Sequence, residues 1–167
     1  RTIDLTLDPG PDAEDTGRGL PNYLFDASIS PDGSALWVSS KKDNIARGMA
    51  RDGQELTFDS TVRSIVSAID LGSGAAQDDL ARRIDFNDRG FPAASAFSPL
   101  GNLGFAVSLP TNRIEVFDPY LGEALFSIPS AGLAPMGVAI NAAGNRLCVF
   151  NFLSRTVAIF PVSALCG

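Results

Sequence analysis

Apolar residues occur along the chain in short runs of four to seven positions, and turn-forming residues separate the runs. Val, Ile, Leu, Phe and Ala dominate the runs, while Gly, Asn, Pro and Ser lie between them. Runs of this length and composition are typical of β-strands, because an amphipathic helix needs a longer periodic segment. The 16 Gly and 11 Pro are spread along the sequence. The pattern therefore predicts an all-β fold with many turns.

One turn recurs three times and reveals an internal repeat. It ends in Gly and lies between two apolar runs, at residues 30–33, 98–101 and 141–144. The last two turn glycines are 43 residues apart, whereas the first two are 68 apart. Most of this difference is an insertion of about 20 residues in the first repeat, at about 41–62.

Each repeat contains the runs of a four-stranded antiparallel unit. The expected strands are 25–30, 35–40, 66–71 and 81–86, then 93–98, 103–108, 113–118 and 124–128, then 137–141, 146–151 and 156–162. Units of about 43 residues with four strands are typical of β-propeller blades. We predict three four-stranded antiparallel blades in a partial ring, at 20–87, 88–129 and 130–167, the third lacking its own outer strand. A β-sandwich with accidental self-similarity is the alternative.

The start of the chain predicts one more strand. Residues 2–8 alternate between apolar and polar side chains, the pattern of a half-buried outer strand within an N-terminal strand and linker at 1–19. Three blades are too few for a ring, which takes about four to eight. We expect other blades from a second copy, giving a six-bladed homodimer, or from the remainder of a larger parent. The chain begins at Arg1 without Met, as a fragment or a processed product does.

Charge and composition argue against several functions. The net charge is −6 and the pI is about 4.5, the opposite of the basic character that nucleic-acid binding needs. No apolar stretch approaches the roughly 18 residues of a membrane span. The chain has no His, which removes Ser-His-Asp and Cys-His nucleophile systems, His-ligated zinc and an axial His for haem. We expect no metal and no cofactor in this chain.

The remaining candidate chemistry is limited. Cys148 and Cys166 form no CxxC motif, and we expect Cys148 to be a buried strand residue that is not bonded to Cys166. Asp85, Asn87 and Asp88 lack the full alternation and terminal Glu of a calcium loop, and they predict a charged surface turn instead.

Candidate binding residues cluster on the loop face, where the connections from second to third strand and from one blade to the next emerge. The insertion supplies Lys41, Lys42, Asp43, Asn44, Arg47 and Arg51, and the other loops supply Asn87, Asp88, Arg89, Asn112, Arg113, Asn151 and Arg155. Arg guanidinium groups, with their paired N–H donors, and Asn amides suit an anionic or polar ligand or an acidic protein surface. Alternatively, the Asn residues only supply turn conformations. Leu56 and Phe58 are expected to pack back onto the blade.

The turns and the strands that follow them resemble the YVTN-type propeller repeat of bacterial and archaeal cell-envelope proteins. The resemblance covers residues 30–40, 98–122 and 135–162, with departures at 141–143 and Pro161. Segments 41–48, 57–63 and 151–155 are similar to propeller regions of bacterial proteins that carry c-type cytochrome, di-haem-peroxidase-like domains. The resemblance implies a periplasmic or cell-surface location and a c-type cytochrome as candidate partner, with any haem on that partner because CxxCH is absent.

These observations favour a non-enzymatic envelope propeller that acts as a binding or assembly module. The runner-up is the propeller part of a redox enzyme or electron-transfer complex whose haem or metal lies on another chain or a missing segment. A propeller hydrolase or lactonase is disfavoured, because such sites usually combine a metal with His and carboxylates. Enzymatic activity of this chain alone is not expected.

Overall fold

A computed structural model describes residues 2–72 and 74–164. These residues form eleven β-strands, a four-residue helix α1 (Phe58–Thr61) and a short 3-10 helix η1 (Val162–Ala164). The first sheet contains β1 (Leu20–Ile29), β2 (Ala35–Asp43), β3 (Val62–Asp70) and β4 (Gln77–Phe86). The second contains β5 (Pro92–Phe97), β6 (Gly104–Ser108), β7 (Arg113–Asp118) and β8 (Glu123–Pro129). The third contains β9 (Pro135–Ile140), β10 (Arg146–Asn151) and β11 (Thr156–Pro161).

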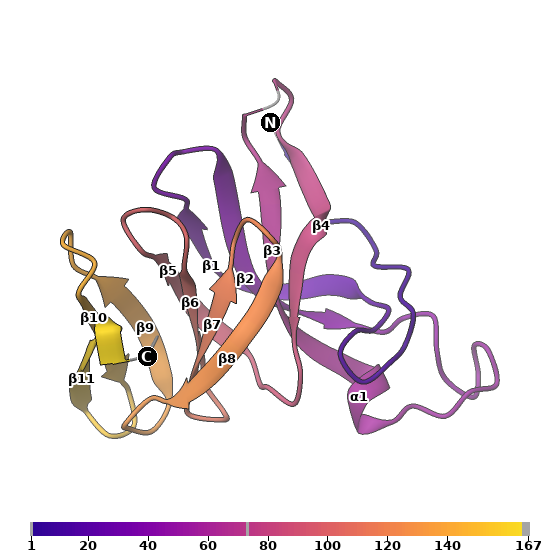
Figure 1. Cartoon of the computed structure of the whole chain (residues 1–167). Coiled ribbons are helices and arrows are strands. Elements are labelled where there is room, and N and C mark those ends of the chain that lie inside the picture. The colour runs from indigo at the N-terminus through magenta and orange to yellow at the C-terminus, as the bar shows by residue number, and fades with distance from the viewer. Residues whose placement is uncertain (1, 73, 165–167) are drawn as a thin grey trace.

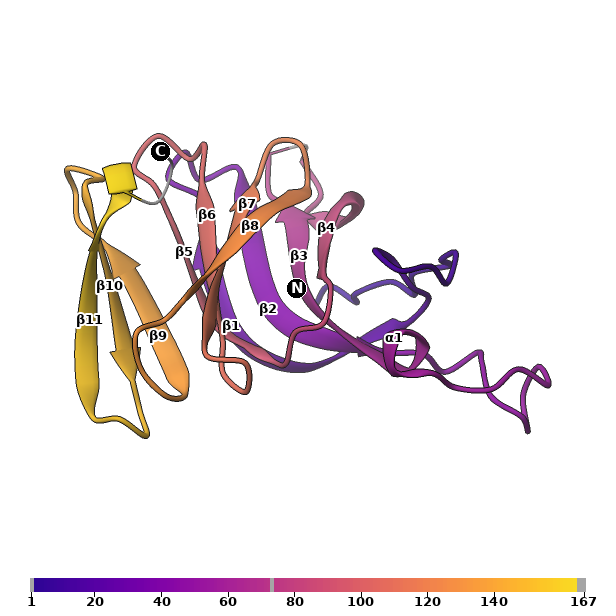
Figure 2. The same cartoon turned by 60° about the horizontal axis from the view of Figure 1, so that its bottom comes forward.

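Each strand pairs antiparallel with its neighbour in the chain, so the three sheets are simple meanders. All eleven strands predicted for the blades are present, and the third sheet has three strands, as the missing outer run predicted. The sheets stand side by side in an open fan (Figures 1 and 2). β5 packs between β1 and β9, which places the first strand of each sheet along one side of the fan.

The repeated turn has the same geometry in all three sheets. Gly33, Gly101 and Gly144 have φ values of 74°, 72° and 69°, which glycine adopts without steric cost. In each turn the glycine N–H donates to a carbonyl three residues earlier, over 2.8 Å. The third turn therefore keeps the conformation of the other two, although its Asn-Ala-Ala sequence departs from theirs.

Two apolar cores join the sheets face to face. The core between the first and second sheets contains Ala35, Trp37, Val66, Ala68, Ile84, Phe86, Phe97, Ala106 and Phe117. The core between the second and third is built on Phe105, Val107, Ile114, Val116, Leu147 and Val149. Alternate residues of β6 thus face opposite neighbours, as in a stack of blades.

The N-terminal segment departs from the prediction. Residues 2–7 form no strand, and among the described residues of the segment the strand-like pairing is limited to an isolated bridge between Asp8 and Gly19. Side chains of β4 form hydrogen bonds with the backbone N–H and carbonyl groups that would otherwise pair with a neighbouring strand. The Thr6 N–H donates to the Asp78 carboxylate over 2.8 Å, and Arg83 donates to the Thr6 carbonyl over 2.8 Å. The segment is thus held to the first sheet by charged side chains instead of a strand.

Two smaller expectations concern cysteine and membranes. Cys148 is half-buried instead of buried, because its side chain lies on the face of the third sheet away from the second, and Cys166 lies outside the described residues. No helix within residues 2–72 and 74–164 is long and apolar enough to cross a membrane.

Candidate functional site

The insertion emerges on the loop face, beside the connections between the other sheets (Figure 1). β2 and β3 extend into it as far as Asp43 and Val62, so the insertion is a longer hairpin that carries a loop and α1. Thr57 caps α1, since its hydroxyl accepts from the Ser60 N–H. In Figure 2 the loop projects away from the other two sheets.

Asp12 fastens the insertion to the N-terminal segment. Its carboxylate accepts from the Arg18 guanidinium over 2.9 Å, from Arg47 over 3.2 Å and from the Asn44 amide over 3.2 Å. Burial opposes the charge, but the hydrogen bonds from Arg18 and Arg47 outweigh it and lower the pKa of Asp12 to about 2. Arg47 and Asn44, both predicted binding residues, are thus engaged within the chain.

Lys42 is a buried structural residue. Its side chain is 0% exposed, and its ammonium lies 2.6 Å from Asp8 and 2.7 Å from Asp85. Burial raises the pKa of Asp85 against the pull of Lys42. For Asp8 burial also opposes the charge, but the hydrogen bond from Lys42 outweighs it and lowers the pKa.

These ion pairs lie on the face of the first sheet that points away from the second. Trp37, which lies opposite Ala68 on β3, faces the second sheet. Side chains alternate along a strand, so Lys42, five residues later, and Arg63, which lies opposite it on β3, project to the other side. Arg63 donates to the carbonyls of residues 13 and 14 of the N-terminal segment, and Arg83 pairs with Asp78 over 2.6 Å. The N-terminal segment therefore covers this face, and we call it the N-terminal cap (residues 2–19).

Lys41 and Arg51 are placed differently from Lys42. The Lys41 ammonium lies 2.6 Å from Asp43 and 4.4 Å from the centroid of the Tyr23 ring. The rings of Tyr23 and Phe25 pack against Phe91 in tilted arrangements, with centroids 6.3 and 5.7 Å from the Phe91 centroid. Arg51 is exposed in the loop.

The other predicted residues mostly shape turns. Asn112 and Arg155 adopt φ of 55°, and the Asn112 side chain accepts from the Ala134 N–H over 2.7 Å. Asn151 is 1% exposed and donates to Thr156. Arg113 donates to Ser127 over 2.7 Å. For these residues the structure agrees with turn and strand-end roles.

A cavity of about 290 Å³ opens on the loop face between the first two sheets. Its lining is Phe58, Val62, Arg63, Phe86, Asn87, Asp88, Arg89, Gly90, Pro110 and Thr111. It unites three predicted residues, Asn87, Asp88 and Arg89. Arg89 is positioned by Glu115 at 2.7 Å, and burial raises the pKa of Glu115 against the pull of Arg89.

Phe58 contributes to this cavity, contrary to the expectation that it packs onto the blade. It is 75% exposed, and Leu56 is 48% exposed. The Thr57 cap starts α1 at Phe58, which sets this side chain at the rim of the cavity instead of in the core. The sequence signal was the Thr57 cap next to an aromatic residue.

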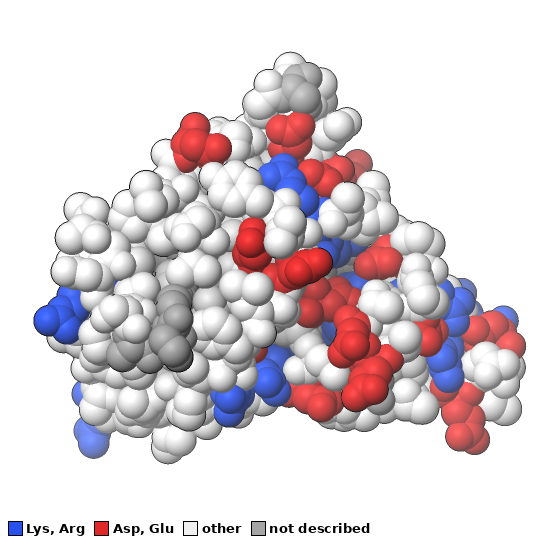
Figure 3. Space-filling view, viewed as in Figure 1, with Lys and Arg blue, Asp and Glu red and all other residues white. Residues whose placement is uncertain are grey.

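Charge is unevenly distributed over the sheets. In Figure 3 the acidic and basic side chains gather over the first sheet and the N-terminal segment, while the third-sheet side is mostly uncharged. The outward face of the third sheet carries Gly137, Ala139, Cys148, Phe150, Val157 and Ile159, as the strand register shows. Phe150, Val157 and Ile159 are 47%, 65% and 62% exposed. Within the described ranges no group of three His, Cys, Asp or Glu side chains could hold a metal ion.

Solved structures share this arrangement. Hydrazine synthase of Kuenenia stuttgartiensis matches 84% of this chain and 46% of its own, with 18% identity and a TM-score of 0.68. A candidate 6-phosphogluconolactonase from Bacteroides uniformis matches 85% of this chain and 37% of its own, with 15% identity and a TM-score of 0.61. The WD40 repeats of RRP9 match 96% of this chain and 39% of their own, with 13% identity and a TM-score of 0.60.

The chain is an all-β, open part of a β-propeller. It spans less than half the length of each of these structures, and its three blades imply completion by other blades. No protein-family model matches the sequence, and no curated protein matches it. At identities of 13% to 18% the likeness concerns the fold alone.

Proposed function

We propose that this chain is a non-enzymatic binding or assembly module of a cell-envelope propeller, and that it acts through its loop face. The observation that carries the proposal is the loop-face cavity at the base of the insertion. There an aromatic side chain that is 75% exposed stands beside Asp88 and Arg89, at the junction of two blades.

The chemistry of the cavity rim suits a protein segment. Phe58 and Val62 are 75% and 42% exposed and offer an apolar anchor, while Asp88 and Arg89 offer polar contacts around it. Binding hot spots combine an aromatic anchor with a polar rim in this way. Arg89 is already oriented by Glu115, so little side-chain entropy is lost when it binds.

The periplasmic or cell-surface location is part of the proposal and is supported by the likeness of the turns to YVTN-type repeats. Ring completion is proposed to use the outward face of the third sheet, where the exposed side chains are apolar. A six-bladed ring of two copies would set this face against the first sheet of the partner, where the N-terminal cap already lies. The remainder of a larger parent is therefore the favoured source of the missing blades.

Photo-crosslinking from the loop face tests the proposal. A benzophenone amino acid replaces Phe58 in one variant and Leu121, which is 65% exposed on the turn between β7 and β8, in the control. We expect a discrete crosslinked partner from position 58 in an envelope extract of the source organism, and none from position 121. Equal crosslinking from both positions, or none from position 58, would contradict the loop-face assignment.

The alternative, a propeller part of a redox enzyme or electron-transfer complex, rests on the segments similar to cytochrome-associated propellers. The match to hydrazine synthase concerns the fold and adds no residue to this alternative. An absorption spectrum of natively purified material separates the two functions. A Soret band on a co-purifying subunit would favour the redox complex with its haem on that partner.

A further inference from the structure

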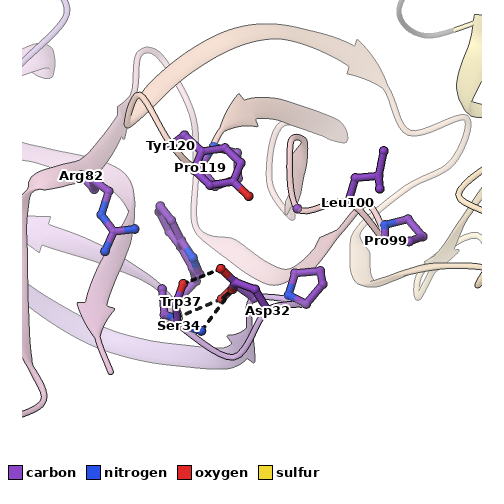
Figure 4. A pocket seen from close by; sticks show the side chains of 12 residues that line it. Asp32, Ser34, Trp37, Arg82, Pro99, Leu100, Pro119 and Tyr120 are labelled. Carbon is purple, nitrogen blue, oxygen red and sulfur yellow. Dashed lines mark hydrogen bonds between the residues drawn. The ribbon is translucent and has the colours of Figure 1, made fainter. Parts of the chain in front are cut away.

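A second cavity lies on the opposite edge of the sheets, which we call the turn face (turns 30–34, 98–103 and 118–122). It has a volume of 280 Å³ and lies between the first and second sheets. Its walls include Asp32, Trp37, Arg82, Leu100 and Tyr120 (Figure 4). Small-molecule pockets start at roughly 300 Å³, so this cavity has room for one small ring.

The floor of the cavity holds an unsatisfied polar atom. Trp37 is 0% exposed, its ring packs at a tilt against Phe97 and Phe117, and its indole nitrogen has no hydrogen-bond partner among the described residues. A buried N–H without an acceptor is unfavourable and is rare in native proteins. The cavity is therefore expected to receive an acceptor group.

The walls offer a charged acceptor and a charged donor. Asp32 accepts from Ser30 over 2.6 Å and from the Ser34 hydroxyl over 2.8 Å, and these bonds with the Ser34 N–H lower its pKa to about 2. Two carboxylate oxygens offer about four acceptor sites, so a further donor can still be bound. The Arg82 guanidinium, bonded to Asp79 over 2.7 Å, lies 5.9 Å from the Trp37 ring.

The repeat shows that this polar pair is not required by the fold. Asp32 precedes the turn glycine and Trp37 follows it by four residues; the second repeat has Leu100 and Phe105 at these positions. At the junction of the second and third sheets, a Cβ on Gly144 would lie 2.9 Å from Pro99, whereas one on Gly101 would meet nothing closer than 3.4 Å. The first junction is thus both more polar and more open.

These features define the ligand. An anion would be repelled by Asp32, and an ammonium group would meet the donors of Trp37 and Arg82. A hydroxyl group both donates and accepts, and the C–H face of a sugar ring can pack on Tyr120 and on the prolines of the rim. We propose that the turn-face cavity binds a neutral polyhydroxylated ligand of the size of one pyranose ring, a function separate from partner binding on the loop face.

The single tryptophan makes the test direct, because Trp37 gives the only indole N–H signal of the chain. The indole resonance is followed by ¹H–¹⁵N NMR during titration with glucose, galactose, mannose and N-acetylglucosamine, and separately with ethylammonium. We expect at least one sugar to shift it saturably. Asp32→Asn should weaken that affinity by roughly tenfold to a hundredfold, since a charged hydrogen bond is lost. Tyr120→Phe, an exposed position, should weaken it by about twofold to tenfold.

The control Glu123→Gln removes an exposed charge near the same edge but outside this cavity, and its sugar affinity should be unchanged. A shift with ethylammonium alone would overturn the polyol assignment. If no solute moves the indole signal, the cavity holds only water and the proposal is wrong. Tyr120→Phe keeps the test valid if Asp32→Asn disturbs its turn.

Discussion

The outward faces at the two ends of the blade stack differ in chemistry and in whether another segment covers them. At the first sheet, the N-terminal cap covers the outward face, and buried ion pairs such as Lys42 with Asp8 and Asp85 hold it there. At the third sheet, the outward face is apolar and uncovered, with Val157 and Ile159 more than 60% exposed. Blades with the same turn geometry thus have outward faces of different chemistry.

The difference shows what each face is suited to bind. On the first face, charged side chains form hydrogen bonds with backbone groups; Arg63, for example, donates to the carbonyls of residues 13 and 14. Such a face binds only a segment whose backbone has matching geometry. An apolar sheet face packs against any complementary apolar surface, and each Val or Ile buried there contributes about 1.5 to 3 kcal/mol. The first face is therefore closed by a specific segment, and the third is suited to another blade.

The largest effect is expected where the cap is held. Lys42→Ala leaves the carboxylates of Asp8 and Asp85 close together without their shared cation. We expect the free energy of unfolding in urea to fall by about 3 to 5 kcal/mol. Lys41→Ala is the matched control, because its partly exposed pair with Asp43 should cost less than about 1 kcal/mol. Equal losses for the two neighbouring lysines would remove the contrast between buried and surface pairs.

The next effect concerns the apolar face. In the chain alone no further blade covers the third sheet, so two copies should associate through their outward apolar faces, and Val157→Lys with Ile159→Lys should abolish this association. The fold of the monomer should change little because both side chains are exposed. Sedimentation velocity over a range of concentrations measures the association. Leu121→Lys with Leu153→Lys, at positions that are 65% and 66% exposed in turns, is the control. A wild-type chain that remains a compact monomer of 17.5 kDa would contradict this prediction.

The smallest effect depends on pH. The pKa of Asp12 is about 2 in the folded chain, below its ordinary value of 3.8, so its ionised form stabilises the fold. This contribution, about 1 to 2 kcal/mol, is present above about pH 4 and is lost as the pH falls toward 2. Urea unfolding of Asp12→Asn should differ from wild type at neutral pH and converge with it near pH 2. Asp4→Asn, an exposed change in the same segment, should follow the wild-type curve throughout.

The blades were predictable because the pattern that defines them is local. A turn glycine with positive φ, flanked by apolar runs, marks β9 and β10 even where the turn reads Asn-Ala-Ala. The conformation of the N-terminal segment was not predictable. The alternation at residues 2–8 concerns side chains and does not show which groups form hydrogen bonds with the backbone. Here the side chains of Asp78 and Arg83, more than 70 residues later, form hydrogen bonds with the backbone N–H and carbonyl of Thr6.

The site residues also divide into those that a local sequence pattern identifies and those whose role depends on contacts distant in sequence. Lys41 and Lys42 are adjacent and chemically alike, and the ion pairs of Lys42 with Asp8 and Asp85 show that it is the one that projects under the cap. The cluster of Asn87, Asp88 and Arg89 could be predicted because the three residues are adjacent in one loop. The approach of Phe58 from the insertion depends on tertiary structure and was missed.

The N-terminal cap also has a consequence for the order in which the protein is assembled during synthesis. Residues 2–19 are synthesised before the first blade, yet their anchors Asp78, Arg83 and Asp85 are made only when β4 is complete. Contacts over such sequence separations form slowly, because a long loop must close before any contact is gained. During translation the cap stays unpaired while β1, β2, β3 and β4 are made, so a segment that precedes the first blade in the sequence is among the last to pack against it.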